Sequence, residues 1–126
     1  MILGFKQQFV QPILSGTKMH TIREDLNDRW HAGRVAQFAT GVRTKNYKQF
    51  DEREIVSTQR IFITAYDEVI VSINSKRLGL KELETLAIND GFDTLEQFED
   101  FFINQLSKRI RKQMSGKIIH WTDFKY

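Results

Sequence analysis

The stretch GTKMHTIRED, residues 16–25, gathers side chains that could do chemistry into a short segment. If a strand begins near His20, Thr21 and Arg23 project from the same face, because side chains alternate along a strand. Lys18 lies in the turn before that strand, and its long flexible stem lets the amine reach the same face. A hydroxyl, an amine and a guanidinium on one cleft suit a phosphate, the edge of a base or a polarised carbonyl.

The same residues also fit an ordinary exposed strand. Lys18 and Arg23 can be solvated cations, and Arg23 can pair with Glu24 or Asp25 on the surface. Four polar residues in eight form a loose pattern, so the spacing alone leaves a binding site and a solvated edge both open.

The elements around this segment indicate how it would be held. Residues 9–14 contain apolar pairs at helical spacing, with Pro12 in the first turns, so we predict a short helix that ends at Gly16 as its cap. We predict strands where β-branched and aromatic residues gather: residues 19–24, residues 34–40, residues 54–74 as two strands reversing near 65–68, and residues 116–126. The cluster would therefore lie between a helix end and the start of a strand.

Helical periodicity appears in the second half of the chain. Over residues 78–91, Leu80, Leu83 and Ala87 fall on one face, and Gly91 is a natural stop.

A second helix is expected directly afterwards. Asp93 and Glu96 form a capping-box pattern at its start. Its predicted core face comprises Leu95, Phe98, Phe102 and Leu106. Strands mixed with a few helices, without a βαβ alternation, predict one α+β domain over residues 1–126, built on a small mixed β-barrel of about five to six strands with flanking helices.

Composition narrows the function classes. The chain has 126 residues, the size of one domain, and 40% of them are hydrophobic, which fits a folded protein. Because there is no cysteine, disulfides, thiolate nucleophiles and cysteine-bound zinc are excluded. The histidines, His20, His31 and His120, lie far apart in the sequence and match no known zinc spacing, so we predict no metal site and no cofactor.

The chain also lacks sequence signals for a membrane. No apolar run approaches the roughly 20 residues that span a bilayer. Residues 1–9, MILGFKQQF, lack the charged lead and the long apolar stretch of a secretory signal. We therefore expect a cytoplasmic protein with no membrane partner.

Charge is unevenly distributed along the chain. The net charge is +3 and the pI is near 9.3. Residues 1–60 hold ten Lys or Arg against six acidic residues, whereas residues 82–100 hold seven acidic residues and no Lys or Arg. The run SKRIRKQ, residues 107–113, is basic again. A polyanion would contact the first and last of these regions and avoid the middle one.

Two aromatic residues near cations are candidates for contact with nucleic acid. Trp30, in DRWHAGR, either stacks a base at the cleft mouth or covers the end of the barrel. Tyr47 lies in GVRTKNYKQF with Arg43 and Lys45 nearby, a mixture typical of RNA contact and equally of a solvated loop with one anchoring tyrosine.

The stretch ILSGTKMHTIR, together with the upstream Phe9, resembles the signature of ASCH domains, which are small relatives of the PUA fold. The family pattern is a glycine, any residue, a lysine, four residues and an arginine, and here these are Gly16, Lys18 and Arg23. NDGFDTLEQF, residues 89–98, is similar to the helical segment of many members. The resemblance implies a β-barrel with a cleft between barrel and helices, and RNA binding is the activity generally proposed for the family.

One enzymatic branch of the family resembles this chain more closely. Its members are small amidohydrolases that remove the acetyl group from N4-acetylcytidine, using a lysine, a threonine and a glutamate. The resemblance places these roles on Lys18, Thr21 and Asp90, with aspartate in place of glutamate. A lysine of depressed pKa would act as a base towards the threonine hydroxyl or water, and Arg23 or backbone N–H groups would stabilise the oxyanion.

The expected function is therefore binding of RNA, a nucleoside or a nucleotide in a cleft lined by Lys18, Thr21 and Arg23. The alternatives are deacetylation of an N4-acetylcytidine-like nucleoside, with Asp90 completing the site, and a non-catalytic protein-interaction module. The candidate ligand-binding residues are Gly16, Lys18, Arg23, Trp30, Arg43, Lys45 and Tyr47.

Overall fold

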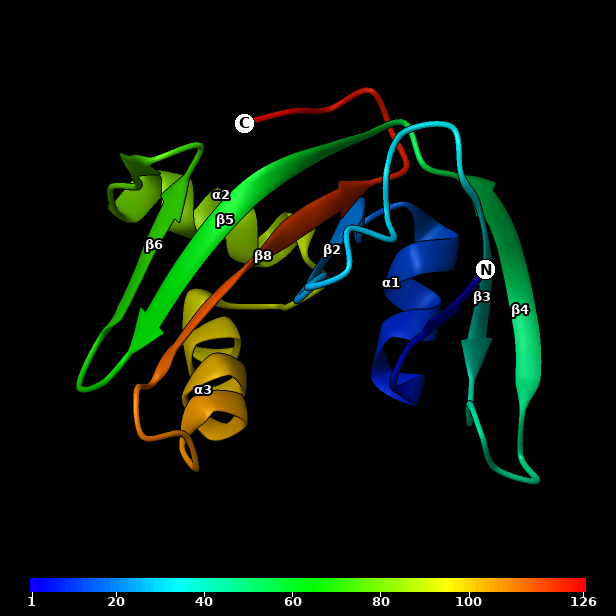
Figure 1. Ribbon diagram of the computed structural model, residues 1–126, viewed down its shortest axis with the longest axis horizontal. Coiled ribbons are helices and arrows are strands. Elements are labelled where there is room, and N and C mark those ends of the chain that lie inside the picture. Colours follow the sequence, from blue (N-terminus) through cyan, green and yellow to red (C-terminus); the bar gives the residue numbers. More distant parts are fainter.

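Two β-sheets and three α-helices make up the fold (Figure 1). The computed structural model describes residues 1–126. The strands are β1 (Ile2–Gly4), β2 (His20–Arg23), β3 (Val35–Thr40), β4 (Lys48–Glu54), β5 (Ser57–Ala65), β6 (Val69–Ile73), β7 (Lys76–Arg77) and β8 (Gln113–His120). The helices are α1 (Val10–Ser15), preceded by a 3-10 turn at Gln7–Phe9, α2 (Leu80–Asn89) and α3 (Leu95–Leu106). The predicted α+β class is confirmed.

The strands are divided between two open sheets, and no closed barrel is formed. The smaller sheet has the order β1-β3-β4 and the larger one the order β2-β8-β5-β6-β7. Only the β1–β3 pairing is parallel. In Figure 1, β3 and β4 lie at one end of the molecule and β6 at the other, with β2 and β8 between them.

Aromatic side chains join the two sheets in the core. Phe38 on β3 lies 4.8 Å from Trp121, which follows β8, and 5.0 Å from Phe5, measured between ring centroids. All three rings are buried. Aromatic pairs at such spacings stabilise the fold beyond the burial of their surface area, so these contacts help to hold the two sheets together.

The strands predicted from β-branched and aromatic residues are present, but three others, β1, β4 and the two-residue β7, were missed. The segment 54–74 forms β5 and β6, which reverse after Ala65 as predicted. β1 has only three residues, and β4, KQFDERE, has no β-branched residue and reads as a loop. β4 is a strand because it pairs with β3 along its length, so tertiary contacts override its weak propensity.

The helical predictions hold, with two corrections. Leu80 was placed on the core face of α2, but it is 66% exposed, and the buried face is formed by Leu86 and Ala87. The N-cap of α3 is Thr94, whose hydroxyl accepts from Gln97 N, rather than Asp93. The predicted core residues of α3 are correct for Phe98, Phe102 and Leu106, while Leu95 is partly buried.

No helix in the structure is both long enough and apolar enough to span a membrane.

Candidate functional site

The turn between α1 and β2 is what directs Lys18 inward. Gly16 caps α1 with a φ of 87°, in the left-handed region that favours glycine. Lys18 N then donates to Pro12 O at 2.9 Å, and Met19 N donates to Asn89 O at 2.8 Å. The second bond ties the start of β2 to the end of α2, so a residue just after α2 lies beside Lys18.

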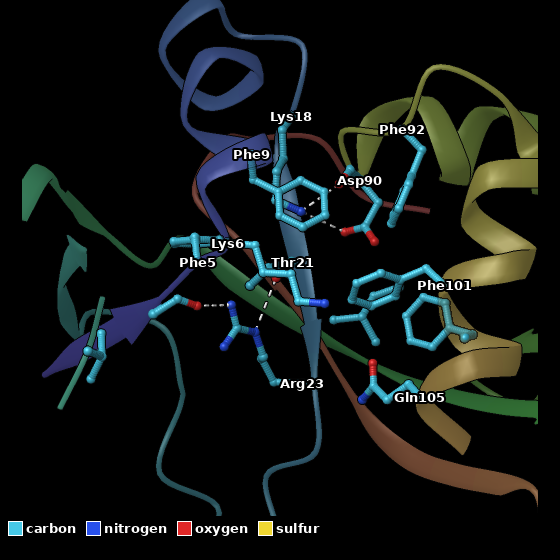
Figure 2. A pocket seen from close by; sticks show the side chains of 14 residues that line it. Phe5, Lys6, Phe9, Lys18, Thr21, Arg23, Asp90, Phe92, Phe101 and Gln105 are labelled. Carbon is cyan, nitrogen blue, oxygen red and sulfur yellow. Dashed lines mark hydrogen bonds and ion pairs between the residues drawn. The ribbon is translucent and has the colours of Figure 1, made fainter. Parts of the chain in front are cut away.

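That residue is Asp90. The amine of Lys18 lies 3.1 Å from Asp90 Oδ1 and donates to the Asp90 carbonyl oxygen at 2.6 Å (Figure 2). Lys18 is 2% exposed and Asp90 is 4% exposed, so the two form a buried ion pair. The interpretation of Lys18 as a solvated surface cation is therefore wrong.

Gly91 allows this close approach. Its φ is 95°, and a Cβ at this position would lie 2.9 Å from Lys18 Cδ. A side chain here would strain the backbone and displace the stem of Lys18.

The surroundings of the Lys18 amine alter its protonation. Burial lowers the pKa of Lys18 below its usual value, and the neighbouring carboxylate of Asp90 opposes this shift. The ammonium group also lies over the ring of Phe9, 4.6 Å from its centroid. An amine with a lowered pKa next to a carboxylate is suited to accept and return a proton.

Thr21 and Arg23 lie on the same face of β2, as the alternation predicted, and both line the pocket that Lys18 lines. Arg23 Nε donates to Thr21 Oγ1 at 3.3 Å, and Arg23 Nη2 donates to the carbonyl oxygen of Gly4 at the end of β1 (Figure 2). The guanidinium also lies 5.1 Å from the centroid of the Phe5 ring. Arg23 therefore joins β2 to β1 and holds a positive charge against the Thr21 hydroxyl.

These side chains line a cavity of about 330 Å³. Its apolar walls come from both halves of the chain, and Figure 2 shows Phe9, Phe92 and Phe101 around the Lys18–Asp90 pair. The lining residues are Gly4, Phe5, Lys6, Phe9, Lys18, Thr21, Ile22, Arg23, Val42, Asp90, Phe92, Phe101, Phe102 and Gln105. A pocket with apolar walls and a few convergent polar groups is the usual form of a small-molecule site.

A second, adjoining hollow of about 410 Å³ extends the cavity outwards. It is lined by Lys6, Phe101 and Gln105, which also line the main pocket, together with Asn104. The Lys6 amine lies 4.9 Å from the centroid of the Phe101 ring. Lys6 is exposed, so its charge is at the mouth of the pocket rather than inside it.

Several residues predicted from the sequence to bind a ligand lie outside the pocket. Trp30 is 7% exposed and belongs to the hydrophobic core, so its prediction as a base-stacking platform is wrong. Gly16 shapes the turn but does not line the cavity. Arg43, Lys45 and Tyr47 are exposed on the turn between β3 and β4.

The structure places that turn close to the pocket all the same. Val42, the residue before Arg43, is one of the lining residues. Val42 is therefore where the turn that carries Arg43 and Lys45 reaches the pocket. Their contact with nucleic acid stays a prediction.

Sequence reasoning missed the polar residues that support Asp90 from behind. His20 Nδ1 lies 3.2 Å from Asp90 Oδ1, and His20 Nε2 lies 2.6 Å from the hydroxyl of Tyr126. Asn89 Nδ2 donates to the same hydroxyl at 3.1 Å. Tyr126 is 106 positions from His20, and no local pattern signals such a contact.

No group of three or more histidine, cysteine, aspartate or glutamate side chains is placed to hold a metal ion.

No protein-family model, curated protein or solved structure matches this chain. The geometry of the pocket is therefore the basis for a functional proposal.

Proposed function

We propose that this chain is an ASCH-type domain that binds a nucleoside or nucleotide in the pocket beside Lys18. The observation that carries the proposal is the cavity of about 330 Å³, in which aromatic rings surround Lys18 and Arg23. Its volume is at the small end of ligand pockets and suits a single nucleoside better than a length of RNA.

The fold is compatible with this family assignment. In place of one closed barrel, the two sheets meet through Phe38 and Trp121, and α3 packs against β5 and β6 of the larger sheet. The pocket lies where residues of β1 and β2 face residues of α3 and of the connection before it. We propose that the paired sheets correspond to the PUA-like barrel and that this is its cleft.

The chemistry of the lining fits a nucleobase and its sugar or phosphate. Aromatic faces such as those of Phe9 and Phe101 can stack on a base, which is worth about 1–3 kcal/mol per base. Thr21 and Gln105 offer hydrogen-bonding groups, and Lys6 at the mouth can meet a phosphate. An RNA chain whose terminal or flipped base fills the pocket could also contact the exposed cations Arg43 and Lys45 on the β3–β4 turn.

Calorimetric titration with cytidine and cytidine monophosphate tests binding. We expect saturable binding that Phe101→Ala weakens about tenfold or more, because the variant loses a stacking surface. Phe62→Ala is a matched control, since Phe62 lies on β5, is 39% exposed and does not line the pocket. Absence of saturable heat with either ligand, or equal losses in both variants, would contradict the proposal.

A second candidate function is hydrolysis of an N-acylated pyrimidine nucleoside, and the Lys18–Asp90 pair specifically favours it. Burial raises the fraction of Lys18 that is neutral, and in that form its amine would take a proton from water or from the Thr21 hydroxyl as the oxygen attacks the acyl carbon. Arg23, which donates to Thr21 Oγ1, would stabilise the negative charge that develops on the carbonyl oxygen of the acyl group. The C–N bond then breaks, and Lys18 returns the proton to the departing amine nitrogen.

With water as the attacking group the carboxylic acid forms directly. With Thr21 an acyl ester forms first, and water hydrolyses it.

Release of cytidine and acetate from N4-acetylcytidine tests this candidate. We expect Lys18→Met and Thr21→Val to abolish release and Lys45→Met, a change on the exposed turn, to leave it unchanged. If the wild-type chain binds N4-acetylcytidine but releases no acetate, hydrolysis is excluded and binding alone is retained.

A further inference from the structure

A polar cluster lies behind Asp90 and contributes nothing to the pocket lining. It consists of His20, which is fully buried, the side-chain amide of Asn89 and the hydroxyl of Tyr126. Together they form an unbroken series of hydrogen bonds that ends on Asp90 Oδ1. A buried polar group is costly unless it is satisfied, and His20, the fully buried member, has a partner at each ring nitrogen.

The direction of each bond follows from the donors available. A carboxylate only accepts, so His20 Nδ1 carries the proton and donates to Asp90 Oδ1. In a neutral imidazole Nε2 is then an acceptor, and it takes the hydroxyl proton of Tyr126. The Tyr126 oxygen accepts in turn from Asn89 Nδ2. Burial lowers the pKa of His20, which supports the neutral form.

The series fixes which oxygen of Asp90 is available to a ligand. Both His20 Nδ1 and the Lys18 amine lie within hydrogen-bond distance of Oδ1, and neither of these bonds uses Oδ2. Asp90 itself lines the pocket. The second oxygen is therefore left as an acceptor for a group in the cavity.

Tyr126 is held in place independently of the pocket. Gln59 Nε2 donates to Tyr126 O at 2.8 Å, and Tyr126 N donates to Gln59 Oε1 at 2.9 Å. His120 Nε2 lies 2.9 Å from the same Gln59 oxygen. The hydroxyl that orients His20 is thus fixed by the backbone of its own residue.

We infer that His20 and Tyr126 are positioning residues that hold Asp90 with Oδ1 on Lys18 and Oδ2 presented to an N–H donor of the bound ligand. The inference rests on the proposed nucleoside pocket and defines its ligand class further: we assign the donor to an exocyclic amine, which cytosine has, so cytosine should be preferred to uracil, whose only base N–H is the ring N3–H. Removing the Tyr126 hydroxyl frees His20 to change tautomer, and Asp90 can then rotate.

Two measurements on the full chain test this inference. Nitrogen-15 NMR of labelled histidine reads the ring nitrogens of His20, and we expect Nδ1 protonated and Nε2 unprotonated at neutral pH. Tyr126→Phe should shift the Nε2 resonance, whereas Tyr66→Phe, at an exposed tyrosine, should not. A His20 protonated on Nε2, or an Nε2 resonance unaffected by Tyr126→Phe, overturns the inference.

Affinities for cytidine and uridine separate positioning from a structural role. A merely structural loss weakens both nucleosides equally, whereas loss of positioning should reduce the preference for cytidine about tenfold in Tyr126→Phe. If Tyr126→Phe keeps the wild-type preference for cytidine over uridine, the inference is overturned, but the proposal that the pocket binds a nucleoside is not. If the wild-type chain binds neither nucleoside, both the proposed function and the recognition of an N–H donor are overturned. The NMR measurement of the His20 tautomer then tests separately whether Tyr126 and His20 orient Asp90.

Discussion

Lys18 in the pocket and the cations Arg43 and Lys45 of the β3–β4 turn occupy opposite environments. Lys18 is 2% exposed and its amine lies 3.1 Å from a carboxylate. Arg43 and Lys45 are exposed and form no ion pair. The difference shows that a positive residue can be a costly interior group or a freely hydrated one, and that the sequence pattern alone does not distinguish them.

The largest expected effect is on stability when one member of the buried pair is removed. Lys18→Met should lower the free energy of unfolding by about 3–5 kcal/mol, because it leaves the Asp90 carboxylate buried without its cation. Arg43→Met with Lys45→Met should change it by about 0.5 kcal/mol or less. Urea unfolding of the three proteins measures both effects.

A double variant sharpens this contrast. Lys18→Met combined with Asp90→Asn removes both charges and keeps an amide oxygen for His20, so it should recover a large part of the lost stability. If Lys18→Met unfolds at the same urea concentration as the wild type, the pair is not a buried ion pair in solution.

A smaller effect concerns a buried histidine, His120, compared with an exposed one, His31. Burial lowers the pKa of His120 from 6.5 to about 4, and the charge of Lys125, together with that of His20 whenever this residue is protonated, adds to this shift. Below pH 6.5 the unfolded chain binds a proton that the folded chain excludes, so stability should fall as the pH drops towards 4. The loss reaches about 3 kcal/mol, at about 1.4 kcal/mol per pKa unit.

Unfolding curves between pH 4 and 7 check this dependence. His120→Gln should reduce the slope, with the buried His20 still contributing the remainder, whereas His31→Gln, which replaces an exposed loop histidine, should leave it unchanged. Equal slopes in wild type and His120→Gln would mean that His120 is hydrated.

The smallest expected effect is on the salt dependence of RNA binding. If the β3–β4 turn contacts phosphates, replacing Arg43 and Lys45 by methionine should reduce the slope of log K against log salt by about 1.4, at about 0.7 per contact with a single strand. Nucleoside binding in the pocket should not change in this variant. Titration of a short RNA at several salt concentrations decides the point, and an unchanged slope removes the turn from the interface.

Much of the local structure could be predicted because it depends on neighbouring residues. The helix stop at Gly16 and the shared face of Thr21 and Arg23 follow from glycine conformation and strand alternation. The α3 core face, with Phe98 and Phe102, follows from helical spacing.

What could not be predicted depends on contacts between distant segments. β4 is a strand only through its pairing with β3, and Trp30 is buried because it belongs to the hydrophobic core cluster. The contact between His20 and Tyr126 likewise has no counterpart in local periodicity. Asp90 was placed near Lys18 only through a family resemblance, and the physical cause, the hydrogen bond from Met19 to the end of α2, is visible only in the structure.

Chemical-shift mapping with cytidine tests the central claim most directly, because it locates the ligand on the molecule. We expect saturable shifts of the backbone amides of Thr21, Phe92 and Phe101, which line the pocket, and little change at Arg43 and Lys45. Shifts confined to the β3–β4 turn, or no shifts at any cytidine concentration, would contradict the assignment of the pocket as a nucleoside site.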